Sequence, residues 1–147
     1  MENKKEKAIT AFKSGFNCAQ SVVVAFAGDL NYDRTAASNT AVGFGGGMGR
    51  LQETCGAVTG AFMVLGLYNS SKCSDNLTLK NATYSMIRQF DAKFKSIHST
   101  TNCKALLQCD LSSDEGHAYA VENRLFEKIC EKCIADAVGI IEELIAE

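Results

Sequence analysis

Three cysteines share one local context, in which an Asn or a Thr precedes the thiol: Asn17-Cys18, Thr54-Cys55 and Asn102-Cys103. Asn and Thr commonly cap the start of a helix, so each thiol is expected in a first helical turn. There it lies near unpaired backbone N–H groups and the positive end of the helix dipole. These groups favour the thiolate, lower the thiol pKa and can hydrogen-bond a bound sulfide. The repeated context therefore predicts a thiol site, with three small buried hydrophobic residues as the alternative.

The other cysteines carry weaker signals. Cys130 and Cys133 form a C-x-x-C inside the last predicted helix, where a spacing of three places both on one helix face. They are interpreted either as two ligands or as two core residues, and no second C-x-x-C completes a zinc-ribbon pattern. Cys73, in a polar stretch, and Cys109, beside Asp110, are interpreted as incidental thiols.

A glycine-rich segment, GFGGGMG, precedes Cys55 and contains Gly43, Gly45, Gly46, Gly47 and Gly49. Glycine costs about 1 kcal/mol against alanine in a helix and readily adopts positive φ, so the cluster predicts a tight loop. The segment lacks the GxxxxGK[ST] order of a phosphate-binding loop, and no convincing strand precedes it, which argues against a nucleotide site. We expect the loop to wrap its backbone closely around Cys55 and whatever that sulfur binds.

Helical spacing and the absence of proline predict an all-α single domain over residues 1–147. The predicted helices cover residues 4–14, 18–27, 33–42, 54–67 and 75–99, a short segment from 103, and a last helix that carries residues 125–144 and starts as early as 118. This makes a bundle of about six or seven helices. Gly56 and Gly60 are four residues apart, which allows close helix approach, so the helix after the glycine-rich loop is expected to be central and buried. The apolar stripe over residues 87–97 is interpreted as core, with the face of a homodimer as the alternative.

Composition narrows the class of protein. Seven cysteines in 147 residues are many for the cytosolic protein that we expect, and they indicate metal binding or thiol redox chemistry before structural disulfides. The net charge of −2 argues against a nucleic-acid partner. No apolar run reaches the roughly 20 residues needed to span a bilayer. We therefore expect a cytoplasmic protein without a membrane span.

Together these motifs resemble the C_GCAxxG_C_C family of small proteins described as redox-active. The motifs that carry the resemblance are Cys18, the GFGGGMG run, Cys55-Gly56-Ala57-Val58-Thr59-Gly60, Cys103 in NCKALLQCDL, and Cys130 before the final helical run. The resemblance covers about residues 15–144 and implies Cys18, Cys55, Cys103 and Cys130 as the functional set. The resemblance implies Cys130 rather than Cys133 as the fourth functional cysteine, because Cys133 stands at a position that is usually apolar in the family. It leaves open whether Cys133 can replace Cys130 as a ligand. Gln108 departs from the family pattern, where relatives often have glycine.

The first hypothesis is an iron–sulfur cluster for electron transfer, held by the four cysteines and exchanging electrons with an unidentified redox partner protein. Backbone at Gly45, Gly46, Gly47 and Gly56 would surround the cluster. One alternative is metal-free thiol–disulfide chemistry, and another is a structural zinc site with four cysteine ligands. All three require the four sulfurs to converge.

Three other side chains receive minor roles in this interpretation. His98 and His117 are interpreted as surface or helix-end residues before metal ligands. Arg50 is a candidate for offsetting negative charge near a thiolate cluster.

Overall fold

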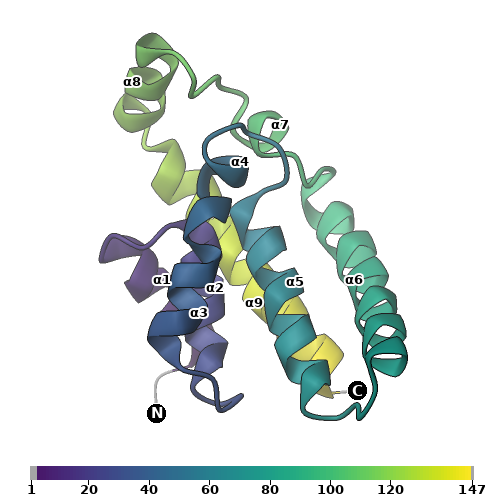
Figure 1. The fold of residues 1–147 in the computed structure, drawn as a ribbon. Coiled ribbons are helices and arrows are strands. Elements are labelled where there is room, and N and C mark those ends of the chain that lie inside the picture. The colour runs from purple at the N-terminus through teal and green to yellow at the C-terminus, as the bar shows by residue number, and fades with distance from the viewer. Residues whose placement is uncertain (1–2, 147) are drawn as a thin grey trace.

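The computed structural model describes residues 3–146, which fold into helices joined by loops (Figure 1). The elements, in chain order, are α1 (Lys4–Lys13), α2 (Cys18–Ala27), α3 (Arg34–Ala41), the 3₁₀ turn η1 (Val42–Phe44), α4 (Gly45–Met48), α5 (Gly56–Ser70), α6 (Asn76–His98), α7 (Cys103–Leu107), α8 (Asp114–Glu122), the π-helical segment η2 (Phe126–Cys130) and α9 (Glu131–Ala146). No named strand occurs in these residues, so the all-α prediction is confirmed. In the same part of the chain, no helix has both the length and the apolar character needed to cross a membrane.

Helix α5 occupies the centre of the bundle, as predicted, and contacts α2, α6 and α9 (Figure 1). The small residues on α5 explain how α2 comes so close. A Cβ atom at Gly60 would lie 2.7 Å from the carbonyl oxygen of Ala19, which is closer than real side chains pack. Glycine at this position therefore allows the two helix backbones to touch.

Several helix starts follow the predicted caps. The side chains of Asn17, Asp33, Asp75 and Asn102 each accept a hydrogen bond from a backbone N–H in the first turn of α2, α3, α6 and α7, respectively. The predicted start of α5 is wrong by two residues, because Cys55, and not the predicted cap Thr54, occupies the N-cap position and the helix begins at Gly56. Thr54 instead forms an isolated antiparallel bridge with Asn102.

The segment predicted as the last helix forms two helices, α8 and α9. Residues 3–146 therefore contain eight α-helices of five or more residues, whereas six or seven were predicted. The break lies at Arg124, whose φ of 56° is left-handed and cannot continue a right-handed helix. Helix α8 begins at Asp114 with Ser113 as its cap, which is before the earliest start, residue 118, predicted for the last helix. In Figure 1, α8 lies apart from the main bundle, and η2 leads from it into α9.

The buried residues form two clusters. The larger one joins α2, α5, α6 and α9 and includes Phe90 and Phe94, which are fully buried. This confirms the core interpretation of the α6 stripe except at its end, where Ile97 is 50% exposed. The smaller cluster joins α7, α8 and η2 around Leu107, Leu111 and Ala120. Six of the seven cysteines belong to these clusters, three to each, so the junction between the clusters is where a thiol site can form.

Candidate thiol site

A cavity of about 480 Å³ lies at this junction, and five of the seven cysteines line it: Cys18, Cys55, Cys103, Cys130 and Cys133. They come from the start of α2, the start of α5, the start of α7, the end of η2 and the first turn of α9. The structure therefore brings together all four cysteines of the predicted functional set, and adds a fifth. Cys73 and Cys109, interpreted as incidental, are not among the residues that line the cavity.

Backbone pairing brings Cys55 and Cys103 together. The N–H of Cys55 donates to the carbonyl of Thr101 at 2.7 Å, and the N–H of Cys103 donates to the carbonyl of Glu53 at 2.6 Å. These two bonds flank the bridge between Thr54 and Asn102, so two extended segments lie side by side just before α5 and α7. Two thiols separated by 48 positions in the sequence thus open two neighbouring helices.

Cys18 is positioned by a capping box at the start of α2. The Asn17 side chain accepts the N–H of Gln20 at 2.9 Å, and the Gln20 side chain accepts the N–H of Asn17 at 3.0 Å. Asn17 also donates its side-chain N–H to the carbonyl of Val42 at 2.8 Å, which attaches this helix start to the segment before the glycine-rich loop. A Cβ atom at Gly56 would overlap the Cys18 sulfur. The sulfur therefore occupies the space that glycine leaves open at the start of α5.

Cys130 and Cys133 lie on either side of the junction between η2 and α9. Cys130 is the last residue of the π-helical segment, in which the N–H of Glu131 bonds to the carbonyl of Phe126. Such wider turns inside helices are frequent at functional sites, because they re-aim the side chains that follow. Cys133 is only 1% exposed, and its side chain faces Cys55. Both residues line the cavity, so Cys133 is more than the apolar wall residue that the resemblance implied.

The glycine-rich loop uses backbone conformations that most residues avoid. Gly46, Gly47 and Gly49 have φ values of 64°, 71° and 63°, so the predicted need for positive φ is confirmed. Gly45, Gly46 and Gly56 line the cavity, and their role in holding a cofactor stays a prediction. Gly47 does not line it: a Cβ atom there would lie 2.7 Å from the Cβ of Cys103, so this glycine packs against α7.

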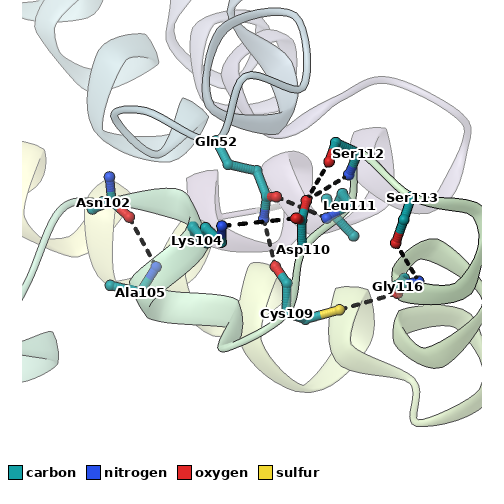
Figure 2. A network of polar contacts seen from close by, with 10 residues as sticks. All are labelled: Gln52, Asn102, Lys104, Ala105, Cys109, Asp110, Leu111, Ser112, Ser113 and Gly116. Carbon is teal, nitrogen blue, oxygen red and sulfur yellow. Dashed lines mark hydrogen bonds and ion pairs between the residues drawn. The ribbon is translucent and has the colours of Figure 1, made fainter.

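Gln52 is a buried residue that sequence reasoning missed. Its side chain donates to the carbonyl of Cys109 at 2.8 Å and accepts the N–H of Leu111 at 2.7 Å, as Figure 2 shows. Gln52 thereby joins the end of the glycine-rich loop to the connection between α7 and α8. Nothing in its immediate sequence signals this role, because both partners lie more than fifty residues away. The thiol of Cys109 is used within that connection, donating to the carbonyl of Gly116 at 3.0 Å.

The expected fall in thiol pKa is wrong for this site, because burial and neighbouring thiols outweigh the helix starts. Burial raises the pKa of Cys18, with a further contribution from Cys55. Contact with the Cys133 side chain, followed by burial, raises the pKa of Cys55 well above its ordinary value. Burial and the charges of Cys55 and Cys18 raise the pKa of Cys103 to about 12. Burial and the charges of the other three raise the pKa of Cys130. The thiols are therefore protonated at neutral pH when nothing is bound.

Backbone N–H groups act in the predicted direction but are too weak to decide the outcome. The N–H groups of Gly46 and Ala19 oppose the rise in the Cys18 pKa. Those of Ala57 and Val58 oppose the rise in the Cys55 pKa, although the thiol of Cys55 makes no capping hydrogen bond. The cavity therefore holds donors that favour thiolate sulfur once the repulsion between the sulfurs is removed.

The remaining candidate residues lie in different places. His98 ends α6 and forms a 2.9 Å contact with Asp136 of α9, so it is a helix-end residue as interpreted. His117 of α8 lines the cavity, with its ring centroid 6.1 Å from that of Phe126, which corrects its interpretation as a surface residue. Arg50 also lines the cavity. Within residues 3–146, no three or more His, Cys, Asp or Glu side chains are grouped closely enough to hold a single metal ion.

The order of these residues along the chain can be compared with known proteins. The family described as "Putative redox-active protein (C_GCAxxG_C_C)" matches residues 16–144. The chain belongs to this family. The resemblance that the cysteines and glycines suggested is thereby confirmed, and with it the description of the chain as a redox-active C_GCAxxG_C_C protein.

One relative is similar along most of its length. An uncharacterized protein of Archaeoglobus fulgidus is 28% identical over 109 residues, which cover 69% of this C_GCAxxG_C_C chain and 72% of the archaeal protein. No solved structure matches.

Proposed function

We propose that this C_GCAxxG_C_C protein transfers electrons through an iron–sulfur cluster held by Cys18, Cys55, Cys103 and Cys130. The observation that carries the proposal is that these four cysteines, from four distant parts of the chain, line one cavity. Four thiolates are the usual ligand set of two-iron and four-iron clusters.

The cavity suits a cationic group with several metal atoms. Crowded, buried thiols resist ionisation because thiolates in low dielectric repel one another, and bound iron would remove that penalty as the protons leave. A zinc ion needs its sulfur ligands about 2.3 Å from one point. The thiols are not grouped that closely in residues 3–146, whereas a multinuclear cluster reaches donors that are farther apart. This favours a cluster over the structural zinc alternative.

The chain's own contribution would be to hold and shield the bound group. A cluster supplies a centre that accepts and releases single electrons. The N–H groups of Gly46, Ala19, Ala57 and Val58 would stabilise the negative charge on its ligands and set its potential. Leu107 and Phe126 form apolar walls that limit access of water. The electron donor and acceptor would be a redox partner protein.

The test is anaerobic reconstitution with ferrous iron and sulfide, followed by measurement of bound iron, acid-labile sulfide and visible absorption. We expect the wild-type protein to retain both elements and to absorb in the visible range. Cys55→Ser should lose most of that absorption, and Cys73→Ser, which removes a thiol outside the cavity, should keep it. Wild-type protein that retains neither iron nor sulfide would rule out the proposal.

A metal-free dithiol is the second candidate, and the contact between Cys55 and Cys133 favours it. The two thiols would reduce a small disulfide substrate. One sulfur–sulfur bond would form in the protein and one would break in the substrate, which would take up the two electrons and two protons. Incubation of metal-free protein with oxidised glutathione should then lower the count of free thiols by two, and Cys133→Ser should abolish the loss. An unchanged thiol count in the wild type would remove this candidate.

A further inference from the structure

We propose that the same cavity binds a small organic acid, with the carboxylate at Arg50 and an apolar, aromatic body against the cavity wall. The inference goes beyond the proposed cluster, because it concerns the part of the cavity that is not sulfur. It applies whether the thiols carry a cluster or act as a dithiol.

The size and the walls of the cavity point to an organic ligand. Its volume of about 480 Å³ lies within the roughly 300–1,000 Å³ that is typical of sites for small organic molecules. Besides the cysteines, the wall is mainly apolar, with side chains from α1, α7, the connection after α7, and η2. They are Phe12, Leu106, Leu107, Leu111, Phe126 and Ile129. Two phenylalanine rings among them favour an aromatic body over a purely polar one.

The charge of the lining determines the sign of the ligand. Among the described residues that line the cavity, Arg50 is the only one of a charged type (Lys, Arg, Asp or Glu). It forms no salt bridge with any carboxylate in residues 3–146, so its guanidinium charge is not neutralised by the described fold. A guanidinium pairs with a carboxylate through two parallel hydrogen bonds. A single cation suits a monoacid rather than a polyphosphate.

The position of Arg50 is built into the loop. A Cβ atom at Gly46 would lie 2.8 Å from the Cγ of Arg50, so the arginine stem runs over the backbone of Gly46. The N–H of that same glycine faces the sulfur of Cys18. Arg50 is an exposed residue, and its stem therefore lies across one glycine from the Cys18 sulfur, at the edge of the cavity.

The backbone conformation at this point is unusual for non-glycine residues. Met48, Arg50 and Gln52 have φ values of 69°, 63° and 55°. Left-handed conformations of bulky residues are uncommon and occur often at ligand-binding sites, where the surrounding structure holds them in place. Here the N–H of Gln52 bonds to Gly46 at 3.1 Å, which closes the loop around Arg50. His117 of α8 also lines the cavity, and an imidazole can donate a hydrogen bond to a bound acid.

The test uses metal-free wild-type protein, benzoate as the probe, and benzyl alcohol as its neutral counterpart. Methyl NMR signals of Leu106, Leu111 and Ile129 report on the cavity, and those of Leu77 on exposed α6 report on non-specific binding. We expect benzoate to shift the cavity signals with a dissociation constant on the order of 1 mM, as for a fragment-sized ligand. Arg50→Gln should weaken benzoate binding about tenfold and leave benzyl alcohol unchanged. The matched control Arg88→Gln, an exposed arginine on α6, should change neither.

Three results would overturn the inference: equal affinity of wild type and Arg50→Gln for benzoate, shifts at Leu77 as large as those in the cavity, or loss of benzoate binding once iron and sulfide are loaded. The last result would mean that a cluster fills the cavity alone. If Arg50→Gln does not fold, Arg50→Lys serves instead, since it keeps the charge but loses the paired hydrogen bonds and should weaken benzoate only partly. Iron content and benzoate binding are measured separately, so this inference and the cluster proposal can fail independently.

Discussion

The sulfur of Cys18 fills the space that a side chain at Gly56 would need. Because Gly56 is the first residue of α5 and Cys18 the first of α2, this contact fixes two thiol-bearing helix starts relative to each other. Glycine at position 56 therefore makes room for the sulfur of Cys18, and backbone flexibility is not the reason for it.

Gly56→Ala is therefore expected to displace the Cys18 sulfur and to destabilise the protein by about 1–3 kcal/mol through overpacking. Its matched control is Gly66→Ala in the same helix, where no described atom lies within 4 Å of the added Cβ. That control should stabilise the protein by about 0.5–1 kcal/mol, because alanine favours the helix. Urea unfolding of both variants measures the difference. Equal effects of the two substitutions would contradict the steric role of Gly56.

Gln52→Ala should destabilise the protein by about 2 kcal/mol, because it leaves the buried N–H of Leu111 and the partly buried carbonyl of Cys109 without their partner. Gln108 provides a close control: its φ of 53° nearly equals the 55° of Gln52, but its side chain is exposed. Gln108→Ala should therefore cost only a few tenths of a kcal/mol. Chemical denaturation gives both values, and faster proteolysis between α7 and α8 in Gln52→Ala would locate the damage. A Gln52 variant as stable as the Gln108 variant would show that the side chain does not join the two loops.

The metal-free protein should lose stability in alkaline solution. The pKa of Cys103 is raised from 9.0 to about 12 in the folded state, so the folded protein holds that proton more tightly than the unfolded chain. Stability is then fully present below pH 9 and falls as the pH rises toward 12, where the folded thiol ionises. Melting temperatures between pH 7 and pH 11 measure the decline, which Cys103→Ser should reduce and Cys73→Ser should not. A flat profile in the wild type would contradict the burial of these thiols.

Cys130 and Cys133 form a matched pair for the ligand set. If Cys130 is the fourth ligand, Cys130→Ser should lower bound iron after reconstitution, and Cys133→Ser should retain it. Cys133→Ser should also lower the pKa of Cys55 in the metal-free protein, because the Cys133 side chain is the largest cause of its rise. Iron analysis and the pH dependence of alkylation at Cys55 measure the two effects. If Cys133→Ser loses iron and Cys130→Ser keeps it, Cys133 and not Cys130 is the fourth ligand.

Sequence reasoning succeeded where the determining interactions are local. Asn17 and Asn102 cap the predicted helices because a side chain reaches only the N–H groups of the next turn. The glycines with positive φ and the central α5 likewise follow from residues close together in the chain. The family membership follows from the order of motifs along residues 16–144. The predicted continuous helix before Leu144 failed at Arg124, because a non-glycine residue in a left-handed conformation leaves no reliable signal in a sequence.

Tertiary structure alone decided the direction of the thiol pKa shifts and the presence of Cys133 and His117 in the cavity wall. The sequence supplied the helix starts, whose dipoles and N–H groups favour thiolates, but it could not supply the depth of burial or the distances between sulfurs. Those depend on how α2, α5, α7 and α9 pack, and they reverse the sign at Cys18 and Cys55. The same packing places Cys133 and His117 in the cavity wall and joins Gln52 to the connection between α7 and α8. Capping depends on neighbours in the chain, whereas burial and electrostatic repulsion depend on neighbours in space.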